Sequence, residues 1–317
     1  MNVLVTGAGL IGCHLARRMV EGGNRVILFD LSPNREYIGK IASKDKVEIV
    51  AADLRDLPAL LSALKQFKVE TVVHTAGLIG KRVAENTYTG STNNIIGTIH
   101  VLEAARLLGL ARVVYVSTFG VYDRPRIKEG PIGEDAPIGG HNLYTVTKAC
   151  SEHLVHSYAF HHKLDTVIIR PSGVFGRGLY VGGSTVGQIM RDFAMNIIKG
   201  EPFTIDAKVY FANEYVYAKD AARALDLACN AKTLKQRIYN AGSGVVTTAD
   251  DLAQAARELN PKTNARVVGA AAADGSKEFP LDLSVSKAEL GYAPKYPLKE
   301  ALQDYVEELW GERTKQA

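Results

Sequence analysis

The sequence feature that most constrains this chain is a glycine-rich turn between a short apolar strand and a helix, close to the N-terminus. Asn2 to Thr6 is a run of aliphatic and β-branched residues, and a helical pattern follows that ends at Gly22-Gly23. The turn between them reads Gly7-Ala8-Gly9-Leu10-Ile11-Gly12. In this context glycines let backbone N–H groups at a helix N-terminus approach a pyrophosphate. The motif is weak alone, but its position predicts a dinucleotide site.

A carboxylate follows at the distance that such a site requires. A second strand is expected over Arg25 to Phe29 and ends in Asp30, some twenty residues beyond the turn. A carboxylate there would accept hydrogen bonds from ribose hydroxyls and would repel a 2′-phosphate. The sequence therefore favours NAD over NADP, although Arg35 lies near enough to leave NADP open. The alternative is a solvated aspartate after an ordinary turn.

Strands and helices then alternate, and small or polar residues follow each strand. The strands and the residues at their ends are expected to be Val47 to Ala51 before Asp53-Leu54, Glu70 to His74 before Thr75-Ala76-Gly77, Val113 to Val116 before Ser117-Thr118, and a sixth ending in Arg170-Pro171. Helical periodicity covers 57–67 and 93–108 between them. The pattern predicts an α/β fold with a doubly wound parallel sheet, in which ligands bind at the carboxyl edge.

A tyrosine and a lysine stand four residues apart at the start of the next expected helix. Tyr144 and Lys148 lie on one helical face, where a cation favours the phenolate and lowers the pKa of a phenol. Such a pair can move protons, although the spacing alone is common. Ser117 and Thr118 precede it at a sheet edge and alternate in direction, so one hydroxyl can point into the site and orient a substrate oxygen.

Composition excludes several classes of function. The 317 residues are 46% hydrophobic, enough for two lobes, and 38 Lys plus Arg against 34 Asp plus Glu form no basic block. We therefore predict neither a nucleic-acid nor a membrane surface. No apolar run could span a bilayer and no basic segment precedes the first strand, which predicts a cytoplasmic protein. Cys13, Cys150 and Cys229 are expected to be buried small hydrophobes.

The histidines give no metal site, because they lack Cys, Asp or Glu partners at metal-binding spacing. His74 invites a catalytic role. A histidine at the end of a buried strand is more often a hydrogen-bonded structural residue, and we favour that reading.

Taken together and in order, these motifs resemble those of the extended short-chain dehydrogenases/reductases, the NAD-dependent epimerase/dehydratase family, over nearly the whole chain. The matching segments are Thr6 to Gly12, Asp30, Asp53-Leu54, His74 to Gly77, Asn94 to Thr98, Ser117 to Tyr122, Tyr144 with Lys148, Arg170-Pro171, Tyr215 to Asp220 and Tyr239 to Gly244. The resemblance implies an NAD-binding Rossmann domain over 1–172 with 208–245, and a smaller C-terminal α/β substrate lobe over 173–207 with 246–317. It also implies a homodimer formed through helices equivalent to 93–108 and 144–158.

The resemblance also implies the site residues. The catalytic set would be Thr118, Tyr144 and Lys148, with Tyr144 as acid/base and Lys148 holding the nicotinamide ribose while lowering the pKa of the phenol. The implied cofactor-binding residues are Gly7, Gly9, Leu10, Ile11, Gly12, Asp30, Asp53, Leu54, Thr75, Ala76, Gly77, Asn94, Ser117, Tyr144, Lys148 and Pro171. The implied substrate-binding residues are Thr118, Lys81, Gly173 and Asn213.

Departures from the family pattern narrow the reaction. The first glycine loop is one residue shorter than usual. Members that dehydrate sugar nucleotides carry Asp-Glu directly after the catalytic threonine, whereas this chain has Phe119-Gly120, so we do not expect a dehydratase.

The substrate lobe departs as well. Nucleotide-sugar members place one arginine before the strand that matches Tyr215 to Tyr217 and another near the later Asp-x-Ser-Lys run. Here those positions hold Asn213-Glu214 and Ala270 to Ala273. Two charge-assisted contacts to a diphosphate, roughly 1.5–3 kcal/mol each, would be missing. Lys81, Arg177 or Arg191 could compensate.

We therefore expect hydride transfer between nicotinamide and a secondary alcohol or ketone of a small sugar, polyol or similar hydroxy compound without a nucleotide handle. A nucleotide-sugar 4-epimerase, like UDP-glucose 4-epimerase, is the alternative. A non-catalytic dinucleotide sensor is a remote third, since the Thr/Tyr/Lys set is complete.

Overall fold

A parallel seven-stranded sheet forms the centre of the molecule. The computed structural model describes residues 1–42, 46–179, 184–210, 212–269 and 278–313, without the side chains at 81, 312 and 313. The strand order is β10-β6-β5-β4-β1-β2-β3, and each neighbouring pair is parallel. The strands are β1 (Asn2–Thr6), β2 (Arg25–Asp30), β3 (Val47–Ala51), β4 (Thr71–His74), β5 (Arg112–Val116), β6 (Thr166–Pro171) and β10 (Ile238–Ala241). The predicted fold class, a doubly wound Rossmann sheet, is confirmed.

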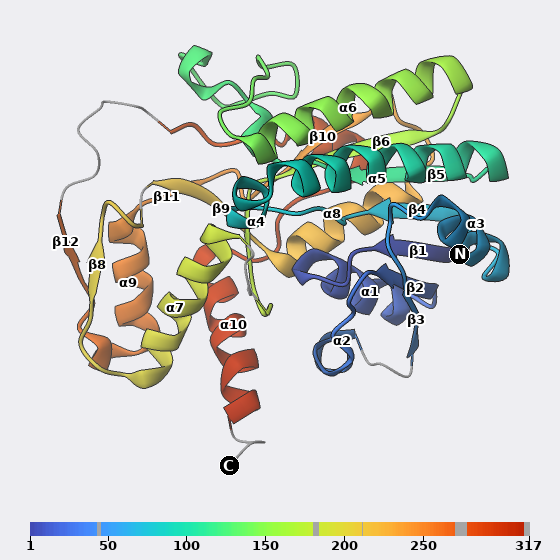
Figure 1. Cartoon of the computed structure of the whole chain (residues 1–317). Helices are drawn as coiled ribbons and strands as arrows, with labels where there is room; N and C mark the ends of the chain where they lie inside the picture. The colour runs from blue at the N-terminus through green and yellow to red at the C-terminus, as the bar shows by residue number, and fades with distance from the viewer. Residues whose placement is uncertain (43–45, 180–183, 211, 270–277, 314–317) are drawn as a thin grey trace.

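Helices cover both faces of this sheet (Figure 1). One face carries α1 (Leu10–Glu21), α2 (Arg35–Ala42) and α8 (Ala218–Asn230). The other carries α3 (Leu57–Gln66), α5 (Thr87–Leu108) and α6 (Leu143–His162). The strands are almost wholly buried because apolar side chains meet helices on both sides. The first four predicted strands match within a residue, whereas α5 begins at residue 87, six residues before the expected 93.

The strand order reverses between β1 and β4, and this places the functional edge. Successive strands run outward from β1 to β3 on one side and from β4 to β10 on the other. Connections leaving β1 and β4 at their carboxyl ends therefore diverge and leave a crevice between them. The glycine turn follows β1, and Thr75-Ala76-Gly77 follows β4, so these segments flank the crevice.

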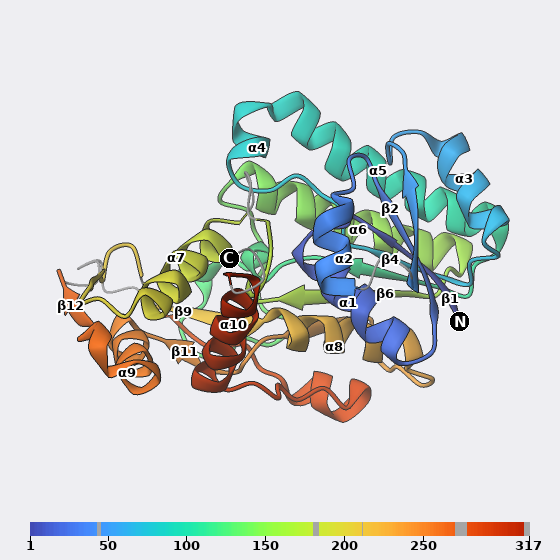
Figure 2. The same ribbon diagram turned by 90° about the horizontal axis from the view of Figure 1, so that it is seen from below.

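A smaller C-terminal lobe lies to one side of the sheet, on the left in Figure 1 and in the view from below in Figure 2. Its helices are α7 (Thr185–Lys199), α9 (Ala249–Leu259) and α10 (Leu298–Arg313). Their apolar faces share a core that includes Met190, Phe193, Leu252 and Tyr305. A two-stranded sheet, β8 (Thr204–Asp206) with β12 (Arg266–Val268), borders it, and β7 (Gly173–Phe175), β9 (Asn213–Tyr217) and β11 (Val246–Thr247) form a three-stranded sheet.

Ion pairs fasten the last helix to the Rossmann part. Lys219 on α8 pairs with Asp304 at 2.5 Å and Glu308 at 3.1 Å, both on α10. Arg17 on α1 also contacts Glu308, at 3.3 Å. The predicted discontinuous boundaries of the two parts stay a prediction. Short helices complete the fold, namely α4 (Lys81–Glu85), η2 (Phe119–Val121), η3 (Arg124–Arg126), η4 (Pro261–Thr263) and the π-helix η5 (Ser286–Leu290).

One composition-based expectation is wrong. Cys13 and Cys229 are buried, but Cys150 is exposed, because it lies on the outer side of α6. The helical pattern around Cys150 shows only that it lies in a helix, not which face it occupies.

Two absences concern the described residues only. Within them, no helix has the length and hydrophobicity needed to cross a bilayer, and no three metal-binding side chains gather. The cytoplasmic location stays a prediction.

Candidate active site

Each of the three glycines of the first turn is explained by a different feature of the structure. Gly7 has a left-handed backbone (φ +86°), and a β-carbon on it would lie 2.9 Å from the Ala76 Cα. A β-carbon on Gly12 would lie 1.9 Å from the Gly7 carbonyl oxygen. Gly9 is different, since a β-carbon there would meet no atom of the described chain within 4 Å. Packing therefore requires glycine at positions 7 and 12. The free space at Gly9 is where a ligand can approach the protein backbone.

The helix that follows is suited to an anion. Gly9 is the N-cap of α1 and supplies no side-chain cap, and the first turn carries no acidic residue. The N–H groups at this end are therefore left for a ligand, and the helix dipole favours negative charge there. Together with the space at Gly9, this arrangement fits a dinucleotide pyrophosphate.

Asp30 lies at the end of β2 with its carboxylate held in place. One oxygen accepts a hydrogen bond from the Ala8 N–H and the other from the Ser32 N–H, each at 2.8 Å. Each oxygen keeps a further lone pair that can accept from a ribose hydroxyl. The carboxylate is tied to the glycine turn itself, which fits the NAD preference predicted from its position.

Two further predicted cofactor residues follow β3. Asp53 is paired with Arg55 at 2.6 Å, and the hydrogen bond from Arg55 holds the pKa of Asp53 below its usual value. Leu54 is buried, and its side chain explains Gly97, where a β-carbon would lie 2.9 Å from Leu54 Cδ2.

The segment after β4 is held from both sides. The Thr75 hydroxyl donates to the Thr6 carbonyl at 2.6 Å, and the Ala76 N–H donates to the Thr6 hydroxyl at 3.3 Å. Asn94 on α5 uses its whole amide here, because its oxygen accepts from Leu78 N–H at 2.8 Å and its nitrogen donates to the Leu78 carbonyl at 3.0 Å and to Thr147. Asn94 therefore shapes the loop next to Gly77, and a direct cofactor contact by its side chain stays a prediction.

A capping box fixes the start of the catalytic helix. The Asn142 side chain accepts from the Thr145 N–H at 3.0 Å, and the Thr145 hydroxyl accepts from the Asn142 N–H at 3.3 Å. Tyr144 therefore falls in the first turn of α6. Its side chain is half-buried, and Thr118 is close enough to influence the pKa of its hydroxyl.

The two hydroxyls at the end of β5 separate as their alternation predicts. Ser117 is buried and donates to the Glu152 carboxylate. Thr118 faces Tyr144 and also accepts from the Gly120 N–H at 3.1 Å. Thr118 is thus the hydroxyl available to a substrate oxygen, whereas the side chain of Ser117 is occupied.

Lys148 lies one turn after Tyr144 and is buried. Its Nζ donates to the Val116 carbonyl at 2.7 Å and lies 4.8 Å from the centre of the Tyr115 ring. Burial lowers the pKa of Lys148 to about 8, and the nearby Glu152 opposes this shift. A β-carbon on Gly77 would lie 3.7 Å from this Nζ, so the lysine is next to the loop after β4.

The expectation that Lys148 lowers the pKa of Tyr144 is wrong for this geometry. Burial raises the pKa of Tyr144 to about 12, and the neighbouring Thr118 hydroxyl acts in the opposite direction. The ammonium is directed to the Val116 carbonyl, which explains why it does little for the phenol. The i, i+4 spacing places both residues on one face but does not fix the direction of a long lysine side chain.

His74 is structural, as expected. Its two ring nitrogens contact Thr6 Oγ1 at 2.7 Å and Thr98 Oγ1 at 3.1 Å. Burial lowers the pKa of His74 to about 3, with Lys148 adding to the shift, so the ring is neutral at physiological pH.

The substrate side is formed where the two lobes meet. Gly173 on β7 lies against β9, and a β-carbon there would be 3.1 Å from the Glu214 carbonyl and 3.2 Å from the Asn213 side chain. Asn213 is buried and its side-chain oxygen accepts from the Glu214 N–H at 3.0 Å. Pro171 and Ile11, both predicted at the cofactor, line one small apolar space. The side chain of Lys81 and the segments 180–183 and 270–277 lie outside the described residues.

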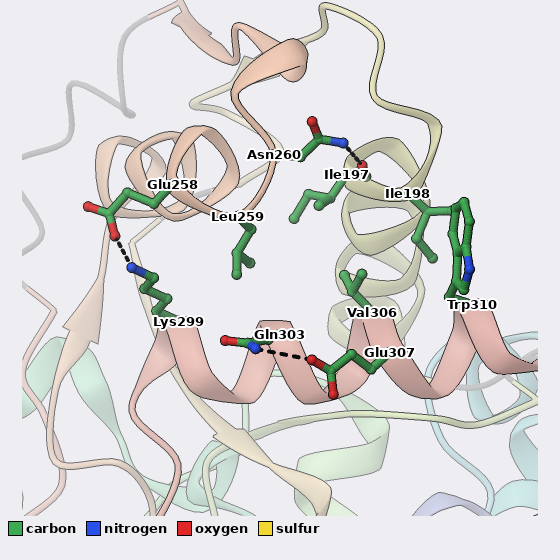
Figure 3. Close-up of a pocket in the computed structure, with 10 residues that line it drawn as sticks. All are labelled: Ile197, Ile198, Glu258, Leu259, Asn260, Lys299, Gln303, Val306, Glu307 and Trp310. Carbon is green, nitrogen blue, oxygen red and sulfur yellow. Dashed lines mark hydrogen bonds and ion pairs between the residues drawn. The ribbon is translucent and has the colours of Figure 1, made fainter.

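A separate groove lies in the C-terminal lobe (Figure 3). It has a volume of about 410 Å³ between α7, α9 and α10, and Ile198, Leu259 and the half-exposed Trp310 line it. None of the predicted site residues lines this groove, so its size does not make it the candidate active site.

A match to a protein-family model shows which family the chain belongs to. Residues 3–242 match the model of the NAD dependent epimerase/dehydratase family. The chain belongs to this family. Because this family is NAD-dependent, the prediction that the cofactor is NAD is confirmed.

Individual relatives of this family differ in activity. The chain is 31% identical to a UDP-glucose 4-epimerase of Mycolicibacterium smegmatis, over 97% of this chain and 98% of that protein. It superposes on the UDP-glucose 4-epimerase of Thermus thermophilus in complex with NAD with a TM-score of 0.81, at 29% identity over 98% of this chain and 99% of that one. It also matches an L-threonine dehydrogenase of Cupriavidus necator, with a TM-score of 0.82 and 25% identity over 98% of this chain and all of that one.

Sequence reasoning missed a buried ion pair behind the site. Arg170 on β6 and Glu152 on α6 are each 2% exposed and paired at 2.6 Å. Glu152 stands four residues after Lys148, so the helical period could have placed it on the same face. No comparable signal marks Arg124, whose position next to Glu214 depends on the fold.

The glycine turn gives the first test. We expect Gly9→Val to lower stability by no more than about 1 kcal/mol, as a poorer helix N-cap, and to raise the Kd for NAD about tenfold or more, because the side chain enters the space left for the ligand. Gly12→Ala should instead destabilise the fold by about 1–3 kcal/mol through the clash with the Gly7 carbonyl. Calorimetric NAD titration and thermal melting check both variants. Equal NAD affinity in Gly9→Val and wild type contradicts the proposed location of the dinucleotide.

The buried lysine gives the second test. Its pKa is about 8 when folded and 10.5 ordinarily, so between these values the unfolded state binds more protons and stability rises with pH. For these pKa values we expect Lys148 to contribute about 2 kcal/mol to the change in unfolding free energy between pH 7 and pH 9.5. Urea unfolding at both pH values, compared with Lys148→Met, isolates this contribution. The same pH dependence in the variant contradicts a buried, proton-poor lysine.

Proposed function

We propose that the chain is an NAD-dependent oxidoreductase that transfers hydride at a secondary alcohol or ketone of a small hydroxy compound without a nucleotide handle. The observation that carries this proposal is the position of Thr118 next to Tyr144 at the sheet edge, with Lys148 one helical turn on. Family membership supports an enzyme of this chemistry. A set of this kind, complete in one place, argues against a non-catalytic dinucleotide sensor.

The roles of the residues follow from their positions. Bound NAD supplies the carbon that accepts or returns a hydride. In the oxidising direction the substrate hydroxyl loses its proton to Tyr144 as the hydride leaves the same carbon, so an alcohol and NAD⁺ give a ketone, NADH and one proton. Thr118 holds the substrate oxygen next to the phenol.

Glu214 supports a substrate without a diphosphate. It stands in the segment where, by the family pattern, nucleotide-sugar members carry an arginine. Its side chain is 1% exposed. Its carboxylate accepts hydrogen bonds from the Gly244 N–H at 2.9 Å and from the Leu281 N–H at 2.6 Å. Burial raises the pKa of Glu214, and these backbone hydrogen bonds oppose that shift. An ionised carboxylate here would repel a diphosphate that the family pattern would place nearby.

The relatives support two different net reactions, epimerisation and oxidation. The relatives of highest identity among those above are UDP-glucose 4-epimerases, which favours a nucleotide-sugar 4-epimerase as the alternative. The L-threonine dehydrogenase relative supports net oxidation on the same scaffold. We favour the dehydrogenase because of Glu214.

The reaction is tested with a panel of free sugars, polyols, hydroxy acids and UDP-sugars. We expect net formation of reduced nicotinamide with a member that has no nucleotide, and Tyr144→Phe should lower kcat roughly 10²- to 10⁴-fold with NAD affinity unchanged. Absorbance of the reduced nicotinamide and product chromatography are the measurements. Interconversion of UDP-sugars without net reduction supports the epimerase instead, and silence with NAD bound supports the sensor.

We also propose the homodimer that the family resemblance implies. Ile96 and Leu107 on α5, eleven residues apart, return to nearly the same helical face, and they are 39% and 50% exposed. Val146 and Phe160 on α6 do the same at 41% and 71%. Apolar stripes on two neighbouring helices suit a second copy of the chain.

Light scattering during gel filtration tests the dimer. We expect twice the monomer mass for the wild type and the monomer mass for Leu107→Glu, because a buried charge in the contact is costly. Val268→Glu places the same change at an exposed valine in the C-terminal lobe and should stay dimeric. A monomeric wild type rules the dimer out.

A further inference from the structure

An arginine that the family comparison does not assign stands at the substrate side of the site. Arg124 begins η3, six residues after Thr118. Its guanidinium carbon lies 4.6 Å from the centre of the Phe119 ring, and Phe119 directly follows the threonine that contacts Tyr144. The guanidinium therefore lies against the residue that follows Thr118.

Two acidic residues of the described chain approach Arg124. Glu278 forms an ion pair with it, and Glu214 faces it from β9. Its side chain is only 27% exposed, and burial lowers the pKa of Arg124 while Glu214 opposes the shift. Glu214 is already bound to the backbone of Gly244 and Leu281, so it holds a loop as well as facing the cation.

The neighbouring arginine is not equivalent. Arg126, two residues on in the same short helix, is 70% exposed and lies 3.9 Å from Asp123. Asp123 also lies 3.4 Å from His141. Arg126 therefore belongs to a solvated cluster at the surface, where screening leaves little net interaction.

We propose that Arg124 binds a carboxylate of the substrate, so that the substrates are small hydroxy acids. Glu278 already occupies the guanidinium, so a substrate carboxylate would take the place of the Glu278 carboxylate on the same donors. The planar fork of arginine matches the two oxygens of one carboxylate. A diphosphate fits less well, because Glu214 and Glu278 flank the single cation.

The oxidation of a hydroxy acid rests on the proposed function. The binding of its carboxylate by Arg124 does not. The hydroxyl proton still goes to Tyr144 and the hydride to bound NAD⁺, so a hydroxy acid yields a keto acid, NADH and one proton. The carboxylate only anchors the substrate and is unchanged. A binding measurement can therefore test Arg124 without turnover.

The test uses threitol, threonate and tartrate, which share one four-carbon skeleton and carry zero, one and two carboxylates. Calorimetric titration of the NAD-loaded protein should detect threonate or tartrate but not threitol. In Arg124→Gln the Kd of the acid should rise roughly 10- to 150-fold, the factor of a lost charge-assisted hydrogen bond. Arg126→Gln should bind like the wild type, and Arg124→Lys should fall between. NAD affinity equal to wild type shows that each variant is folded.

Several outcomes would overturn the proposal. Threitol binding as tightly as tartrate, no binding of either acid, or equal binding by Arg124→Gln and wild type would each show that Arg124 is not a carboxylate site. If an acid is oxidised, KM should rise in Arg124→Gln while kcat changes little. If acids bind through Arg124 but reduced nicotinamide never forms from any member of the substrate panel, the binding site stands and the proposed reaction fails.

Discussion

The buried pair of Glu152 and Arg170 is the interaction on which the rest of the site depends. Arg170 donates to the two Glu152 oxygens at 3.0 and 2.6 Å and to the Glu134 carbonyl at 2.9 Å, and it stacks on the Tyr122 ring. Removing the water from two charges is costly, and a two-point contact of this kind is needed to offset that cost. Loss of one partner would leave a charge buried at about 3–5 kcal/mol. The pair therefore locks α6 onto β6.

That lock sets the catalytic residues around it. Glu152 also accepts from Ser117, which fixes the end of β5 and leaves the next residue, Thr118, facing Tyr144. One turn before Glu152 stands Lys148, whose ammonium is buried beside the same carboxylate and hydrogen-bonded to Val116. A single helix thus carries the tyrosine, the lysine and the glutamate at positions that successive turns bring to one side.

Sequence patterns predicted the sheet and its edge well because they depend on local rules. Strand ends, the glycine turn and the position of Asp30 followed from period and position along the chain. Alternation predicted that only one of Ser117 and Thr118 faces the site, and the family resemblance selected Thr118. What depends on packing between distant segments did not follow. The exposure of Cys150, the direction of the Lys148 side chain and the meeting of Arg124 with Glu214 are set by the fold.

The buried Glu214 carboxylate organises the wall between β9, the loop after β10 and the backbone at Leu281. Glu214 is enclosed so closely that a β-carbon on Gly242 would lie 1.7 Å from its Oε1, so the glycine loop and the carboxylate need one another. The glycine loop comes directly after β10, and the Leu281 N–H also donates to Glu214. The glutamate therefore shapes the wall that a substrate would meet. An arginine in its place would lose those backbone donors, since it has no acceptor atoms. Glu214 therefore holds this wall through hydrogen bonds that an arginine at the same position could not accept.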